Sequence, residues 1–156
     1  MRPIATLNEL SREEFGEALR PLFEAAAPLA GALYSARPFP SYEALIDTAE
    51  SMALNMPFAD QANVLSAHPR IGAKPETLSA ASYREQGNAT EEVHAELQRL
   101  NSEYEQRFGF RFVVFVNKRP KSEILDVLKN RLGNGRDAEL ECGLREMFRI
   151  ARDRLS

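Results

Sequence analysis

Apolar residues recur at helical spacing along nearly the whole chain, and only one short run is typical of a β-strand. That run is FVVFV at residues 112–116, whose β-branched and aromatic side chains favour extended structure. A single strand cannot make a sheet, because the hydrogen bonds of a sheet join neighbouring strands. The sequence therefore predicts an all-α fold in which this run crosses the core as an irregular or short helical segment.

Helix boundaries follow from capping residues, prolines and glycines. Ser11 opens a capping box, Ser41 has the position of an N-cap, and Gly109 is the expected stop of a helix that begins at Thr90. Pro21 predicts a kink or a break in the first of these helices. Together the signals predict a bundle of six to eight helices, with helical segments at residues 11–27, 28–36, 41–56, 57–67, 90–108, 122–132 and 137–156.

The composition narrows the class of protein. A chain of 156 residues fits one domain with one core, and we expect residues 1–156 to form it. The 20 basic and 23 acidic residues give a net charge of −3, which offers no electrostatic reason to bind nucleic acid. The longest apolar run is too short to span a bilayer, and the first ten residues lack the apolar stretch of a signal peptide. We therefore expect a cytoplasmic protein with no nucleic-acid or membrane partner.

Several kinds of site are missing from the sequence. It has no Gly-rich phosphate loop, no pair of histidines at metal-binding spacing and no nucleophile elbow. The single cysteine, Cys142, excludes an intrachain disulfide and is expected to be a small core residue. His94 lies in a charged helical stretch and is expected at the surface. What remains is proton transfer.

His68 is the first candidate for that chemistry. Because proline disfavours the α conformation in the residue before it, Pro69 should end a helix at His68. The imidazole then need not be buried in the core, and an ordinary histidine pKa of about 6.5 suits proton transfer near neutral pH. The sequence leaves open whether His68 only ends the helix or also moves a proton.

The stretch SYREQ, residues 82–86, is the second candidate. On a helix from about Ser79 to Gly87, Ser82, Glu85 and Gln86 would share one face and could hold a small polar ring. The alternative is that Ser82 and Glu85 form a capping box with a purely structural role.

Four stretches in order resemble the family of 2-oxo-4-hydroxy-4-carboxy-5-ureidoimidazoline (OHCU) decarboxylases: HPRIG at residues 68–72, SYREQ at 82–86, RFGFRFVVFV at 107–116, and RLGNGRDAELECGLREMFRIARDRL at 131–155. The resemblance extends over nearly the whole chain. It implies an all-helical, cofactor-free enzyme, commonly a homodimer, whose small-molecule substrate OHCU becomes (S)-allantoin in urate degradation.

The resemblance also implies roles for single residues. It makes His68 the catalytic histidine and proton donor, with Glu85 favouring the imidazolium or holding the substrate. The residues that it places at the substrate are Pro69, Ser82, Tyr83, Arg84, Gln86, Phe110 and Asn117. Asn117 departs from the animal enzymes of the family, which carry an arginine there. The candidates for the missing cation are Lys118, Arg119, Arg111 and Arg84.

Two other functions compete with this interpretation. One is a lyase or hydrolase that acts on a related ureido heterocycle, which the departure at Asn117 keeps open. The other is a noncatalytic helical interaction module, in which His68 and Glu85 are polar residues near helix ends. Such a module should expose a contiguous apolar patch.

Overall fold

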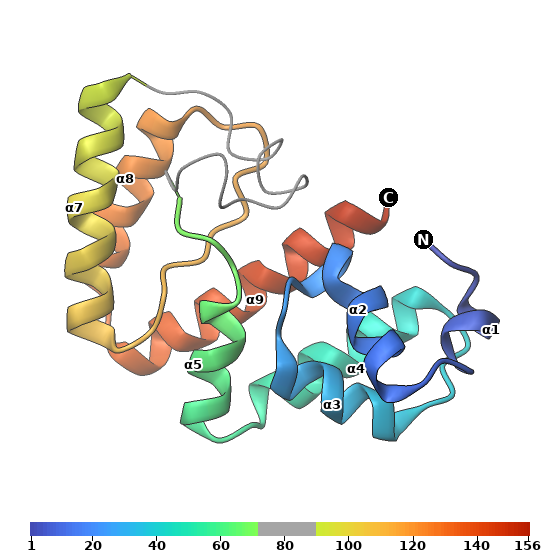
Figure 1. Cartoon of the computed structure of the whole chain (residues 1–156). Helices are drawn as coiled ribbons and strands as arrows, with labels where there is room; N and C mark the ends of the chain where they lie inside the picture. The colour runs from blue at the N-terminus through green and yellow to red at the C-terminus, as the bar shows by residue number, and fades with distance from the viewer. Residues whose placement is uncertain (72–89) are drawn as a thin grey trace.

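The computed structural model describes residues 1–71 and 90–156, and it contains eight helices and no strand within these ranges (Figure 1). The helices are α1 (Ile4–Leu7), α2 (Arg12–Phe23), α3 (Ala27–Ala36), α4 (Tyr42–Leu54), α5 (Phe58–Ser66), α7 (Glu91–Phe108), α8 (Lys121–Arg131) and α9 (Arg136–Leu155). The predicted all-α fold of six to eight helices is confirmed. None of the described helices is long and apolar enough to cross a membrane.

The predicted capping residues stand at the helix ends. Ser11, Ser41 and Thr90 each accept a hydrogen bond on the side-chain oxygen from the main-chain N–H three residues further on, at 3.2, 3.1 and 3.3 Å. Gly109 ends α7 in the left-handed conformation, with φ of 83°. These ends were predictable because each depends on a side chain and the backbone within one turn of it.

Of the kink or break predicted at Pro21, the break does not occur, and one short helix was not predicted. The helix α2 continues through Pro21 and ends at Phe23, so no break occurs at the proline. Pro21 lies in the last turn, where little helix remains to be disrupted by its missing N–H. The short helix α1 (Ile4–Leu7) was not predicted, because four residues are too few to show a helical period.

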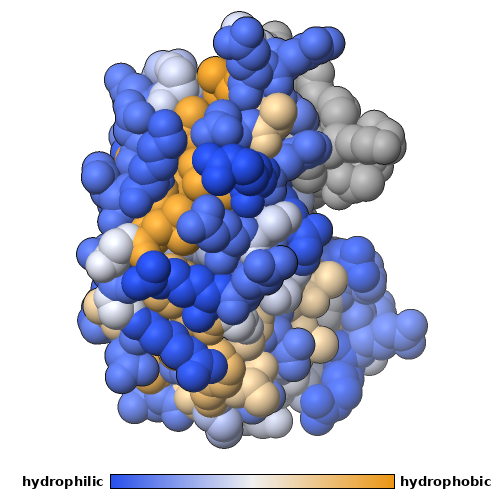
Figure 2. Space-filling model, turned by 90° about the vertical axis from the view of Figure 1, so that its left-hand side faces the viewer, coloured by the Kyte–Doolittle hydropathy of each residue, from blue (hydrophilic) through white to orange (hydrophobic). Residues whose placement is uncertain are grey.

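The helices form two groups that share α9. Helices α2, α3 and α4 pack together on one side, and α7 and α8 pack against each other on the other side (Figure 1). Helix α9, with 20 residues, contacts α2, α4 and α5 as it crosses the molecule. The face seen in Figure 2 is largely hydrophilic, with a strip of hydrophobic residues between hydrophilic ones. Within the described ranges, the large hydrophobic residues that are exposed are Met1 and Phe58.

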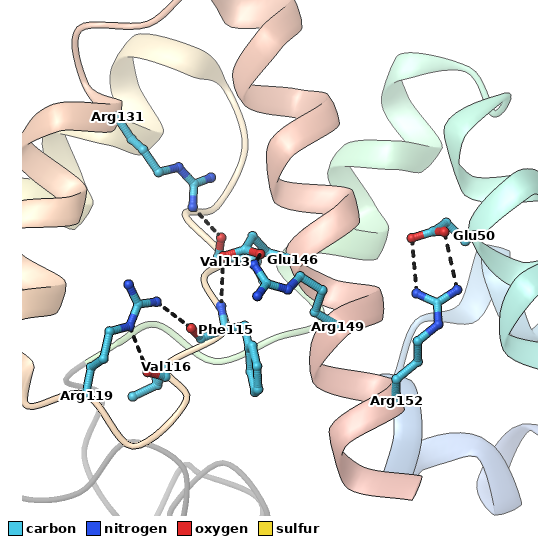
Figure 3. A network of polar contacts seen from close by, with 9 residues as sticks. All are labelled: Glu50, Val113, Phe115, Val116, Arg119, Arg131, Glu146, Arg149 and Arg152. Carbon is cyan, nitrogen blue, oxygen red and sulfur yellow. Dashed lines mark hydrogen bonds and ion pairs between the residues drawn. The ribbon is translucent and has the colours of Figure 1, made fainter. Parts of the chain in front are cut away.

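The segment between α7 and α8 is extended, and side chains supply its hydrogen bonds (Figure 3). Arg131 Nη1 donates to the Val113 carbonyl at 2.7 Å, and Glu146 Oε1 accepts from the Phe115 N–H at 3.3 Å. Arg119 donates to the carbonyls of residues 115 and 116 at 2.6 and 3.0 Å. The prediction of an irregular segment through the core is therefore confirmed.

A buried polar cluster joins α7, α8 and α9 around one carboxylate. Glu139 accepts from Arg131 Nε at 2.7 Å, from the Tyr104 hydroxyl at 2.7 Å and from Asn134 Nδ2 at 2.8 Å. We call these four residues the Glu139 cluster. Burial raises the pKa of the Tyr104 hydroxyl, which therefore stays a hydrogen-bond donor. Because both carboxylate oxygens have donors, this buried charge is compensated.

Candidate functional site

His68 follows the end of α5, as Pro69 predicts. The last helical residue is Ser66, and the His68 N–H donates to the Leu65 carbonyl at 3.1 Å in a tightened final turn. Pro69 itself is half-buried. The side chain of His68 differs from the prediction, because the residue is only 4% exposed. A helix end frees the imidazole from its own helix but does not expose it when other elements cover that end.

The imidazole of His68 is buried, and its pairing within residues 1–71 and 90–156 is unusual. Within the described part of the chain, neither Nδ1 nor Nε2 has a hydrogen-bond partner. Buried polar atoms in folded proteins are nearly always paired, since an unpaired one costs about 1–3 kcal/mol. An unpaired ring at this position is therefore a destabilising feature that a bound polar ligand would relieve.

The charges of a buried ion pair act on this ring. Arg154, in the last turn of α9, donates from Nη2 to Glu24 Oε1 at 3.0 Å, and the two side chains are 6% and 12% exposed. Glu24 follows the end of α2 with φ of 57° and ψ of −153°, a conformation that is essentially restricted to glycine. The end of α2 is thus held in a strained form that keeps a carboxylate next to Arg154.

Arg111 reaches the same place from the extended segment. Its Nη1 donates to the main-chain carbonyls of Ser66 and His68, both at 2.7 Å. We call His68, Glu24, Arg111 and Arg154 the His68 cluster, since the charges of the other three all act on the imidazole. The cluster combines residues that are up to 130 positions apart in the sequence.

Burial, together with the positive charges of Arg154 and Arg111, lowers the pKa of His68 to about 4, although the negative charge of Glu24 opposes the shift. The imidazole is therefore neutral near pH 7. The ordinary value near 6.5 expected from the sequence does not apply, because it describes a histidine in water. The cluster is a neutral ring in a positively charged setting, which favours an anion as the ligand.

The other predicted site residues fall in three places. Ser82, Tyr83, Arg84, Glu85 and Gln86 lie outside the described residues, so the predicted convergence of His68 and Glu85 stays a prediction. Phe110 is buried among aromatic rings, with centroids 6.2 Å from Phe58 and 5.9 Å from Tyr104. Asn117 is exposed in a tight turn with φ of 50°.

The candidates for the missing cation also separate. Lys118 is exposed beside Asn117, while the guanidinium of Arg119 is bound to main-chain carbonyls. Arg111 is bound to carbonyls as well, although it lies at the His68 cluster. Away from the cluster, His94 and Cys142 are half-buried on α7 and α9, so Cys142 is not a fully buried core residue.

Sequence reasoning missed Glu24 and Arg154. A signal for Arg154 was present, because it continues the buried stripe of α9 at helical spacing from Met147 and Ala151. Nothing comparable marks Glu24, whose backbone conformation is unusual for its residue type. Within the described residues, no group of three or more His, Cys, Asp or Glu side chains could hold a metal ion.

Comparison with known proteins identifies the family of the chain. The model of the OHCU decarboxylase family matches residues 8–156. The 2-oxo-4-hydroxy-4-carboxy-5-ureidoimidazoline decarboxylase of Amia calva is 31% identical over 157 residues, which cover 96% of this chain and 90% of that protein. The uric acid degradation bifunctional protein PucL of Bacillus subtilis is 34% identical over 158 residues, covering 96% of this chain and 31% of that longer protein.

A solved structure has the same fold. The crystal structure of OHCU decarboxylase in the presence of (S)-allantoin matches with a TM-score of 0.73 and 26% identity, over 89% of this chain and 94% of that one. A family match that spans almost all residues, together with these relatives, shows that the chain belongs to the OHCU decarboxylase family.

Proposed function

We propose that the chain decarboxylates OHCU to (S)-allantoin in urate degradation, with His68 as the proton donor and with Glu85 and Gln86 positioning the substrate. The observation that carries this proposal is a buried imidazole that has no hydrogen-bond partner among the described residues and that experiences the positive charges of Arg154 and Arg111. The substrate offers what the cluster lacks, since it has a carboxylate and several hydrogen-bonding groups. Family membership makes the chain a carboxy-lyase.

The reaction needs an electron sink and one proton. When the bond between the ring carbon and the carboxylate breaks, CO₂ leaves and the electron pair stays on the ring. The substrate's own C=N bond, next to that carbon, accepts the pair, so we propose that no external cofactor takes part. A proton then adds to one face of the ring, and general acid catalysis of such a step contributes about 10²- to 10⁴-fold.

The low pKa of His68 adds a condition to this mechanism. A neutral imidazole is a weak acid, so His68 must gain a proton before it can serve as an effective donor. A bound carboxylate would raise the pKa of His68, because a nearby negative charge favours the imidazolium. We propose that the substrate thereby prepares its own acid, and that proton uptake accompanies binding.

Replacing His68 by asparagine tests the function. We expect His68→Asn to lose at least about 100-fold in turnover, because the proton donor is removed, and to keep the far-ultraviolet circular dichroism of the folded chain. OHCU is generated freshly from urate by the upstream enzymes, and the formation of (S)-allantoin is followed by circular dichroism. A variant that unfolds would favour a role for His68 in ending the helix.

A related ureido heterocycle is the alternative substrate. The exposed Asn117, without the guanidinium that the animal enzymes carry there, is the observation that favours it. If the wild-type protein fails to speed (S)-allantoin formation yet binds ureido compounds, this alternative holds. We also propose that the protein is a cytoplasmic homodimer and that residues 1–156 form a single domain. Light scattering after gel filtration tests the homodimer.

A further inference from the structure

The end of α5 has carbonyl groups that the helix itself cannot satisfy. In a continuing helix each carbonyl would accept from the N–H four residues further on, but α5 ends at Ser66, and Pro69 disfavours the helical conformation at His68. Arg111 supplies what is missing, since one nitrogen, Nη1, lies 2.7 Å from the Ser66 carbonyl and 2.7 Å from the His68 carbonyl. The residue that carries the imidazole is therefore held through its own main chain.

We propose that Arg111 is a positioning residue for His68, whose guanidinium fixes the main chain at residues 66–68 and so aims the imidazole into the site. The inference rests on the proposed role of His68 as the proton donor. It assigns Arg111 a role different from the cation that binds the substrate, for which the sequence made it a candidate.

The surroundings of Arg111 suit this role. The residue that follows it, Phe112, is only 1% exposed, so the main chain that bears the guanidinium is anchored in the core. A cation at the end of a helix also interacts favourably with the partial negative charge of the final carbonyls. Short charge-assisted bonds to two carbonyls define a geometry that a single bond would leave free to rotate.

The chain after His68 is held by two further contacts. Arg70 forms an ion pair with Glu105 of α7 at 2.6 Å, and Asn101 Nδ2 donates to the Ile71 carbonyl at 2.9 Å. These contacts fix the chain beyond Pro69, and the Arg111 bonds fix it before Pro69. Loss of Arg111 should therefore loosen His68 locally rather than unfold the segment.

Arg111 also affects the charge balance at the ring. The charged groups that act on His68 are Arg154 from α9, Glu24 from the end of α2 and Arg111 from the extended segment. Removing one positive charge favours the imidazolium, so the pKa of His68 should rise. This effect is measurable without any substrate, which separates it from the proposed function.

The experiment compares Arg111→Met, which keeps an unbranched apolar stem but neither charge nor donors, with Arg111→Lys, which keeps the charge and one donor group. For Arg111→Met we expect kcat to fall by between about 10- and 100-fold with little change in KM, because a displaced donor slows the chemical step. Arg111→Lys should recover part of kcat. Thermal unfolding followed by circular dichroism checks that both variants are folded.

Titration of the histidine ring protons by NMR is the second measurement. The chain has two histidines, and a His94→Gln variant assigns the signals. We expect the His68 midpoint to rise in Arg111→Met and to return toward the wild-type value in Arg111→Lys. Should Arg111→Met not fold, Arg111→Gln takes its place: a fall in kcat with little change in KM supports the positioning role, and a wild-type kcat overturns it.

Other outcomes are equally decisive. A rise in KM with unchanged kcat in Arg111→Met would mean that Arg111 binds the substrate, and the proposal would fail. Unchanged kinetics and an unchanged midpoint would also overturn it. If His68→Asn retains full activity, the proposed function fails instead, while the NMR midpoint still reports whether Arg111 acts on His68.

Discussion

The Glu139 cluster and the His68 cluster are both buried and charged, and each includes one arginine nitrogen without a partner in the described ranges, Nη2 of Arg131 and Nε of Arg111. The two clusters differ in how their central groups are paired. Glu139 accepts three hydrogen bonds on its two oxygens, while both ring nitrogens of His68 lack a partner in the described ranges. A charge with all its donors stabilises a unique arrangement of helices. A polar ring without them is available to a ligand.

The two clusters also share one helix. The buried face of α9 begins near Glu139 and ends at Arg154, which are separated by 15 residues or about 22 Å of helix. The buried face of α9 thus carries Glu139 of the Glu139 cluster at one end and Arg154 of the His68 cluster at the other. Burial alone does not distinguish a charged group that stabilises the fold from one that belongs to a ligand site. The hydrogen bonds around the group distinguish the two roles.

The largest effect is expected from breaking the structural cluster. Arg131→Met leaves Glu139 buried without its guanidinium, and we expect the free energy of unfolding to fall by about 3–5 kcal/mol. Urea unfolding measures the loss. The control is Arg152→Gln. Arg152 pairs at the surface with Glu50 (Figure 3) and with Asp47, and these pairs should contribute less than about 1 kcal/mol. Equal losses in both variants would remove the distinction between the buried and the exposed pairs.

The next effect is a dependence of stability on pH that comes from His68. Since its pKa falls from 6.5 to about 4 on folding, the unfolded chain binds more protons between these values. The free energy of unfolding should therefore be fully present above pH 6.5 and decline as the pH falls, by about 3 kcal/mol in total at about 1.4 kcal/mol per pKa unit. Urea unfolding at pH 7, 6, 5 and 4.5 follows the decline. His68→Asn is the control, and its unfolding free energy should depend less on pH in this range. If both proteins show the same dependence on pH, a group other than His68 is titrating.

The smallest effect concerns the strain at Glu24. Glu24→Ala and Glu24→Gly both remove the carboxylate, but only glycine adopts φ of 57° and ψ of −153° without steric cost. We expect the glycine variant to be more stable than the alanine variant by about 1–2 kcal/mol, measured as the difference in unfolding free energy. If alanine is equally stable, the end of α2 relaxes once the pair with Arg154 is lost, and the ion pair is what holds the strained form.

The sequence predicts local features of this fold better than the site. The caps at Ser11, Ser41 and Thr90, and the end of α5 before Pro69, depend on contacts within a turn or two, so they can be read from neighbouring residues. The burial of His68 depends on residues that are distant in the sequence. Local patterns do not report such contacts, which is why the pKa of His68 and the role of Arg154 were not anticipated.

The extended segment at residues 112–116 has a consequence for the behaviour of the unfolded chain. The side chains of Arg119, Arg131 and Glu146 bind four of its main-chain groups, the Phe115 N–H and the carbonyls of residues 113, 115 and 116, in place of a neighbouring strand. When the chain unfolds and these hydrogen bonds are lost, the main-chain groups of residues 112–116 are unpaired. They can then pair with the same residues of another copy, as strands do in a cross-β assembly. These three side chains therefore also act as gatekeepers against aggregation.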